Sequence, residues 1–107
     1  MKVLEKEIQA AILQYLTYIG VFCWRNNTGA FKTSYKGKER FMRFGLTGSA
    51  DILGIYKGRF LAIEVKAVGN TITEAQRWFI HEIRRNKGIA FVAYSVEDVQ
   101  NELKNYV

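Results

Sequence analysis

The fold is decided by residues 51–66, DILGIYKGRFLAIEVK. Two runs rich in β-branched and aromatic residues, 51–56 and 59–66, are separated only by Lys57 and Gly58, the length of a two-residue hairpin loop. We therefore expect two paired antiparallel strands. A loop of this length also fixes the register: Tyr56 pairs with Arg59, and Asp51 falls opposite Glu64.

This register brings two acids together. Directly opposed residues have Cβ atoms about 5 Å apart, and like charges so placed are destabilising. Glu64 and Lys66 share one face because strand side chains alternate. Charge is costly to bury unless it is paired or metal-bound, and carboxylate oxygens are the ligands that Mg²⁺ takes. We expect a divalent cation between Asp51 and Glu64; the alternative is a half-exposed strand in which Lys66 neutralises one acid.

Before this hairpin the sequence predicts one helix and two short strands. Apolar residues at 3.6-residue spacing predict a helix from about residue 3 to 19. A short apolar strand is expected over 21–25. Residues 26–37 are polar and interrupted by glycine, and a further strand is expected over 40–44.

After the hairpin the pattern predicts helix, strand and helix. Thr73 and Gln76 have the spacing of a capping box, and helical periodicity continues to about Asn86. A strand over 89–94 and a helix opened by Ser95 follow. The element order predicts an α/β fold, a mixed sheet with helices packed on it, in a single domain over 1–107.

Composition limits the class of protein. The 107 residues are 49% apolar with a net charge of +6, which excludes disorder through low hydrophobicity. No apolar run approaches the roughly 18 residues of a membrane span, and acids stand where a signal peptide would be apolar, so we expect no membrane and a cytoplasmic location. One Cys and one His cannot build a thiolate or histidine zinc site, so a metal would be held by oxygen.

Further charged residues are candidates for the site and for its substrate. At about 100° per residue, Glu5 faces the apolar side of the first helix and Glu7 faces away, although a first-turn acid can simply favour the helix dipole. Basic residues surround a single acid between positions 25 and 43: Arg25, Lys32, Lys36, Lys38, Arg40 and Arg43. Aromatic residues are interleaved with them, which favours nucleic-acid binding. The alternative is a solvated hairpin whose aromatics pack inward. We expect Trp24 and Trp78 in the core or in a dimer interface.

Three sequence features together resemble the PD-(D/E)xK nuclease superfamily: residues 48–51 (GSAD), residues 63–66 (IEVK) and the early helical Glu5. In particular, the chain resembles a stand-alone VRR-NUC (virus-type replication-repair nuclease) domain. The resemblance implies a restriction-endonuclease-like core and a Mg²⁺-dependent, structure-selective DNA endonuclease that hydrolyses phosphodiester bonds, with Mn²⁺ as a possible substitute. Ala50 stands where the superfamily name has Pro.

The resemblance also implies residue roles. Asp51 and Glu64 would hold the metal with the backbone carbonyl of Val65, and Lys66 would orient the attacking water or stabilise developing charge. Glu5 matches the helix-1 acid of Holliday-junction resolvases. Gln76 matches an accessory glutamine of the family, but at the third helical position it can also reach back to the Thr73 amide.

The expected partner is branched DNA, in particular a four-way junction. Stand-alone members of the family resemble junction resolvases in acting as homodimers, since two strands must be cut. The alternatives are a flap nuclease or nickase, or an inactive nucleic-acid-binding module. A viral origin, which the family name suggests, would place the protein in the host-cell cytoplasm.

Overall fold

The computed structural model describes residues 4–107, and its centre is a four-stranded sheet in the order β1-β4-β5-β6. The strands are β1 (Phe22–Arg25), β4 (Ile52–Tyr56), β5 (Arg59–Val65) and β6 (Ile89–Ala93). Neighbours pair antiparallel except β5 and β6, which are parallel, so the sheet is mixed. The predicted α/β fold with a mixed sheet in one small domain is confirmed.

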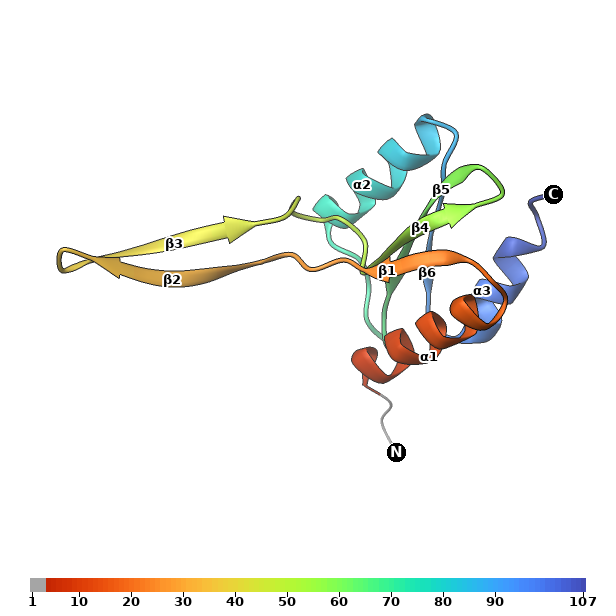
Figure 1. Cartoon of the computed structure of the whole chain (residues 1–107), viewed down its shortest axis with the longest axis horizontal. Helices are drawn as coiled ribbons and strands as arrows, with labels where there is room; N and C mark the ends of the chain where they lie inside the picture. The colour runs from red at the N-terminus through yellow and green to blue at the C-terminus, as the bar shows by residue number, and fades with distance from the viewer. Residues whose placement is uncertain (1–3) are drawn as a thin grey trace.

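Three helices cover the sheet, two on one face and one on the other (Figure 1). They are α1 (Glu5–Tyr18), α2 (Glu74–Arg85) and α3 (Val96–Leu103). The larger core joins buried side chains of α1 and α3, such as Leu16 and Val99, to one face of β5. That face carries Leu61, Ile63 and Val65. The smaller core joins Phe79 of α2 to Ala62, among others, on the opposite face. No helix within residues 4–107 has the length and apolar character needed to cross a membrane.

The β4–β5 hairpin has the predicted register. Tyr56 pairs with Arg59 and Ile52 with Ile63. Lys57 and Gly58 have φ angles of 50° and 80°, so both loop residues are left-handed, as a two-residue turn of this hand requires. Strand pairing therefore aligns the chain so that Asp51 approaches Glu64.

A second hairpin, which the sequence did not predict in full, projects from the sheet as a two-stranded ribbon of β2 (Gly29–Tyr35) and β3 (Lys38–Phe44) (Figure 1). Residues 29–35 lie in the polar segment in which no strand was predicted, and the strand expected over 40–44 begins at Lys38. Its turn is again Lys-Gly, with φ angles of 51° at Lys36 and 75° at Gly37. Neither face of the ribbon is buried, so no apolar alternation marks these strands.

Other boundaries differ by one or two residues. The first helix ends at Tyr18 rather than at residue 19, and its expected start at residue 3 lies outside the described residues. The last strand ends at Ala93, before position 94. The capped starts of α2 at Thr73 and α3 at Ser95 are confirmed, since both side chains accept from the third helical amide.

Half of the sheet face that carries α2 is left uncovered. Phe22, Ile55 and Phe60 are aligned across β1, β4 and β5 by the strand registers, and all three are exposed. Trp24 lies next to Phe22 on the same strand face and is 41% exposed, and Trp78 of α2 is 51% exposed. We call Phe22, Trp24, Ile55 and Phe60 the open half-face. The two tryptophans are therefore not core residues.

Candidate functional site

The candidate site lies where β4 and β5 diverge. Their pairing ends at Ile52 and Ile63, and beyond it the Val65 N–H donates to Asp51 Oδ2 at 2.8 Å. The two backbone polar groups of a strand residue face the same neighbouring strand. The Val65 carbonyl therefore faces the edge at which the Asp51 carboxylate lies.

The loop before Asp51 is fixed from two sides. Asn26 Nδ2 donates to Ser49 Oγ at 2.7 Å and to the Ala50 carbonyl at 3.0 Å, while the Asn26 N–H donates to the Asp51 carbonyl at 2.8 Å. Gly48 lies against Ala75 of α2 so closely that a Cβ would stand 2.6 Å from the Ala75 carbonyl oxygen. Asp51 is thus positioned by β1 and by the first turn of α2.

Glu64 is the buried acid of the site, 3% exposed. Its Oε1 accepts a hydrogen bond from Gln76 Nε2 at 3.1 Å. Its Oε2 is buried and, within residues 4–107, has no hydrogen-bond partner. Buried polar atoms are nearly always satisfied, so this oxygen needs a proton, a water or a cation beside it.

Gln76 does two things at once. Its Oε1 accepts from the Thr73 N–H at 2.9 Å, which closes the capping box, and its Nε2 donates to Glu64. The two readings of Gln76 left open by the sequence are therefore compatible. The helix cap fixes the side-chain rotamer that holds the Glu64 carboxyl.

Asp51 and Glu64 lie so close together that each carboxyl group affects the ionisation of the pair. Burial, contact with the Asp51 carboxyl and the charge of Asp51 raise the pKa of Glu64 to about 9, and the charge of Glu5 adds to the rise. The nearby charge of Lys66 opposes it. Without a cation the pair therefore retains a proton at neutral pH.

The acid of α1 that lies close to the pair is Glu5. Glu5 is half-buried, and its Oε2 accepts from Asn70 Nδ2 at 3.0 Å. The Asn70 carbonyl in turn accepts from the Tyr94 hydroxyl at 3.1 Å. Glu7 is exposed and accepts from the Leu4 N–H at 3.4 Å. Sequence reasoning did not single out Asn70 or the anchoring role of Asn26, and no local pattern marks either residue.

Lys66 follows directly after β5 and is half-buried. Its N–H donates to the Ala93 carbonyl at 3.1 Å, which holds the backbone beside the end of β6. Among residues 4–107 its ammonium group forms no salt bridge. Because its charge acts on the pKa of Glu64, Lys66 belongs to the same electrostatic cluster.

The donors present fit a hard cation. Asp51, Glu64 and the Val65 carbonyl offer only oxygen, and Glu64 Oε2 is an unpartnered acceptor. No three His, Cys, Asp or Glu side chains between residues 4 and 107 gather closely enough to hold a metal by themselves. Mg²⁺ is usually bound by one or two carboxylates and keeps several waters, which matches a pair of acids rather than a closed cage.

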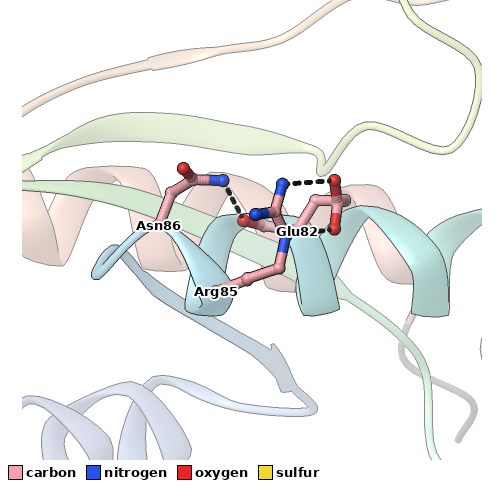
Figure 2. Close-up of polar contacts among 3 residues, drawn as sticks. All are labelled: Glu82, Arg85 and Asn86. Carbon is pink, nitrogen blue, oxygen red and sulfur yellow. Dashed lines mark hydrogen bonds and ion pairs between the residues drawn. The ribbon is translucent and has the colours of Figure 1, made fainter.

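The predicted nucleic-acid-binding cations lie mainly on the ribbon. Five of them are exposed there: Lys32, Lys36, Lys38, Arg40 and Arg43. Arg25 ends β1, shortly before the ribbon begins. The only salt bridge in the described part of the chain joins Arg85 to Glu82 on α2 at 2.9 Å (Figure 2). The ribbon cations therefore have no acid partner within residues 4–107, and the ribbon presents a positive surface.

Comparison with known proteins assigns no family. No protein-family model matches the chain, and no curated protein matches it. The VRR-NUC resemblance thus stays a hypothesis, and function has to be inferred from the residues above.

Proposed function

We propose that the protein is a Mg²⁺-dependent, structure-selective DNA endonuclease that hydrolyses phosphodiester bonds and resolves Holliday junctions as a homodimer. The observation that carries the proposal is the meeting of Asp51 and Glu64 at the divergence of two strands, with one buried, unpartnered carboxylate oxygen. Packing alone would not select two acids there, since buried like charges are destabilising. Groups with a strongly shifted pKa, as Glu64 has, cluster at functional sites.

In this proposal Asp51, Glu64 and the Val65 carbonyl would hold the ion. When bound, Mg²⁺ supplies neutralisation of the charge that develops on the phosphate and lowers the pKa of a water. The Val65 N–H orients the Asp51 carboxylate, and Gln76 orients that of Glu64. These hydrogen bonds fix the two acids before substrate arrives, which is the preorganisation that electrostatic catalysis needs.

Lys66 and Glu5 complete the site. Lys66 places a positive charge beside the acids, where it orients the attacking water or stabilises the negative charge that develops during hydrolysis. Glu5, held by Asn70, adds negative charge on the α1 side and lies outside the set that would hold the metal. The resemblance to junction resolvases gives the helix-1 acid the same place.

DNA binding is assigned to the basic residues before and along the ribbon. Arg25, Lys32, Lys36, Lys38, Arg40 and Arg43 contact backbone phosphates. Each phosphate contact releases counterions, so affinity falls steeply with salt.

The homodimer is supported by the open half-face and by Trp78. Large exposed apolar patches mark interaction sites, and aromatic residues are enriched at the centres of interfaces. Two copies provide the two active sites that a four-way junction requires, whereas one copy would only nick.

The test is cleavage of four-way, flap and linear duplex DNA with Mg²⁺, with Mn²⁺ and with EDTA. We expect paired cuts in the junction with Mg²⁺, and no cutting in EDTA or by Asp51→Asn. Glu97→Gln, which removes an exposed acid from α3, serves as the matched control and should cut normally. Cutting of flaps alone, or single nicks, would favour the flap nuclease or nickase. Binding without cleavage of any substrate would overturn the enzyme and leave a nucleic-acid-binding module.

A further inference from the structure

The two faces of the ribbon differ. Side chains alternate along each strand, and the pairing of Phe31 with Met42 and of Tyr35 with Lys38 settles which residues share a face. One face carries the rings of Phe31, Tyr35 and Phe44. Met42 and the cations Lys38 and Arg40 lie on the same face. We call it the ring face. The opposite face carries Lys32, Phe41 and Arg43, with Lys32 Nζ 5.5 Å from the centre of the Phe41 ring.

Two rings of the ring face contact each other, and all three are exposed. Gly29 pairs with Phe44, and a Cβ at Gly29 would stand 3.0 Å from Phe44 Cζ, so the ring lies across the glycine. Phe31 and Phe44 are 6.3 Å apart between ring centres and tilted by 40°. Phe31, Tyr35 and Phe44 are nevertheless 53%, 72% and 46% exposed. Covering these rings would remove much apolar surface from water.

Cations stand beside these rings on the same face. Lys38 is the register partner of Tyr35, and Arg40, the partner of Thr33, lies between Tyr35 and Phe31 along the face. Neither cation forms a salt bridge within residues 4–107. The ring face therefore offers flat apolar surfaces and positive charge in alternation.

This alternation matches an unpaired stretch of nucleic acid. Each nucleotide has a π-face that stacks on aromatic side chains and a phosphate that attracts Lys or Arg, whereas the bases of a duplex already stack on one another. A second copy of this chain fits less well. It is itself basic, with a net charge of +6, and would place like charges against Lys38 and Arg40.

We propose that the ring face is a binding site for unpaired nucleotides, whose bases stack on Phe31, Tyr35 and Phe44 and whose phosphates contact Lys38 and Arg40. The proposal rests on the proposed function and deepens it, because it names the unpaired nucleotides of a branched substrate as what the ribbon holds. Binding at this face needs neither Mg²⁺ nor cleavage.

The experiment measures binding where cleavage cannot occur. Every protein carries Asp51→Asn and is kept in EDTA. The probes are a single strand of about 12 nucleotides, within the length that one small domain covers, and a blunt duplex of the same sequence. The single strand contains 2-aminopurine, whose fluorescence is quenched by stacking.

The ring-face variant is Phe31→Ala, Tyr35→Ala and Phe44→Ala together, and the control is Phe41→Ala on the opposite face. We expect the ring-face variant to weaken single-strand binding at least about 10-fold, since stacking contributes about 1–3 kcal/mol per base. The change in quenching should disappear, while duplex binding changes less than about 2-fold. Phe41→Ala should leave single-strand binding within about 3-fold.

A second variant tests whether the alanine substitutions act by unfolding the ribbon. Phe31→Leu, Tyr35→Leu and Phe44→Leu together keep apolar bulk and remove the rings, and should lose quenching as well. Equal losses on single strand and duplex, or no loss, would overturn the proposal. So would conversion of a dimer to a monomer in sedimentation with unchanged single-strand affinity, because the ring face would then join two copies.

Failure of the nuclease and failure of the ring face are separable. Selective single-strand binding by a protein that cuts nothing would support the ring face and overturn the enzyme. Cleavage that depends on Asp51, by a protein whose ring-face variant binds normally, would do the reverse.

Discussion

At the scale of single residues, the Glu64 carboxyl has few hydrogen-bond partners. One oxygen is held by Gln76 and the other is buried without a partner among residues 4–107. A cation or a proton must therefore accompany the Asp51–Glu64 pair. Whether the pair binds a proton or a cation depends on the pH and on the metal concentration.

The pH dependence of stability follows from the raised pKa of Glu64. Between its ordinary value of 4.5 and about 9, the folded chain binds a proton that the unfolded chain has lost. The free energy of unfolding in EDTA should therefore fall as pH rises from 5 to 9. Glu64→Gln should remove most of this slope in urea unfolding, and Glu97→Gln should retain it. An unchanged slope in Glu64→Gln would show that the pKa of Glu64 is not raised in the folded chain.

Substitutions at Thr73 and Gln76 distinguish the helix cap from the hydrogen bond to Glu64. Thr73→Ala should lower the free energy of unfolding by about 1 kcal/mol, the usual cost of a lost N-cap, with the Mg²⁺ affinity nearly unchanged. Gln76→Ala should lose a similar stability and also weaken Mg²⁺ binding about 10-fold or more, as outer-shell substitutions do. Calorimetric titration with Mg²⁺ measures the difference. Equal Mg²⁺ affinities in the two variants would reduce Gln76 to a capping residue.

Lys66 is expected to act on turnover more than on binding. Lys66→Ala should lower kcat on a four-way junction about 100-fold or more, the range for removal of one preorganised electrostatic group. The Kd for the junction, measured in Ca²⁺, should change only a few-fold. Lys104→Ala removes an exposed lysine after α3 and should cut normally. Wild-type activity of Lys66→Ala would reject the catalytic role.

At the scale of elements, prediction from sequence succeeded where pairing is local and at least one face is buried. The Lys57–Gly58 loop and the apolar runs beside it fix the register that brings Asp51 to Glu64. The same dipeptide at Lys36–Gly37 was not recognised as a hairpin, because neither face of the ribbon is buried and no apolar alternation exists. Asn26 and Asn70 act across 24 and 65 residues of sequence, and local patterns carry no signal for such contacts.

The ribbon should be separable from the folding of the sheet. No residue of β2 or β3 belongs to either core cluster. Replacing residues 30–43 by Asn-Gly would close a two-residue loop between Gly29 and Phe44. We expect the melting temperature to change by no more than a few degrees, while DNA affinity falls at least 10-fold and its salt dependence weakens. Unfolding of the shortened chain, or unchanged DNA affinity, would contradict this assignment.

At the scale of the whole molecule, the two faces of the sheet are covered unequally. α1 and α3 bury one face, whereas α2 leaves the open half-face on the other. The ribbon, which we propose binds DNA, and the proposed dimer surface are different parts of the chain. Substitutions can address one without the other.

The dimer should depend on the open half-face. Phe22→Glu with Ile55→Glu places acids in the middle of it and should give a monomer in sedimentation velocity, with junction cleavage reduced to single nicks. Tyr18→Glu introduces an acid at an exposed position of α1 and should leave the dimer intact. A wild-type monomer, or a dimer that persists in the double variant, would exclude this surface.

The ribbon leaves and re-enters the sheet between two register partners, Arg25 and Ile52. An arm inserted in this way can change length without disturbing the strands that hold the acids. One residue added to each of its strands would exchange the outward and inward sides, whereas two would preserve them and extend the arm by about 7 Å. Arms of different length would thus place their tips at different distances from Asp51 and Glu64, in steps of two residues per strand.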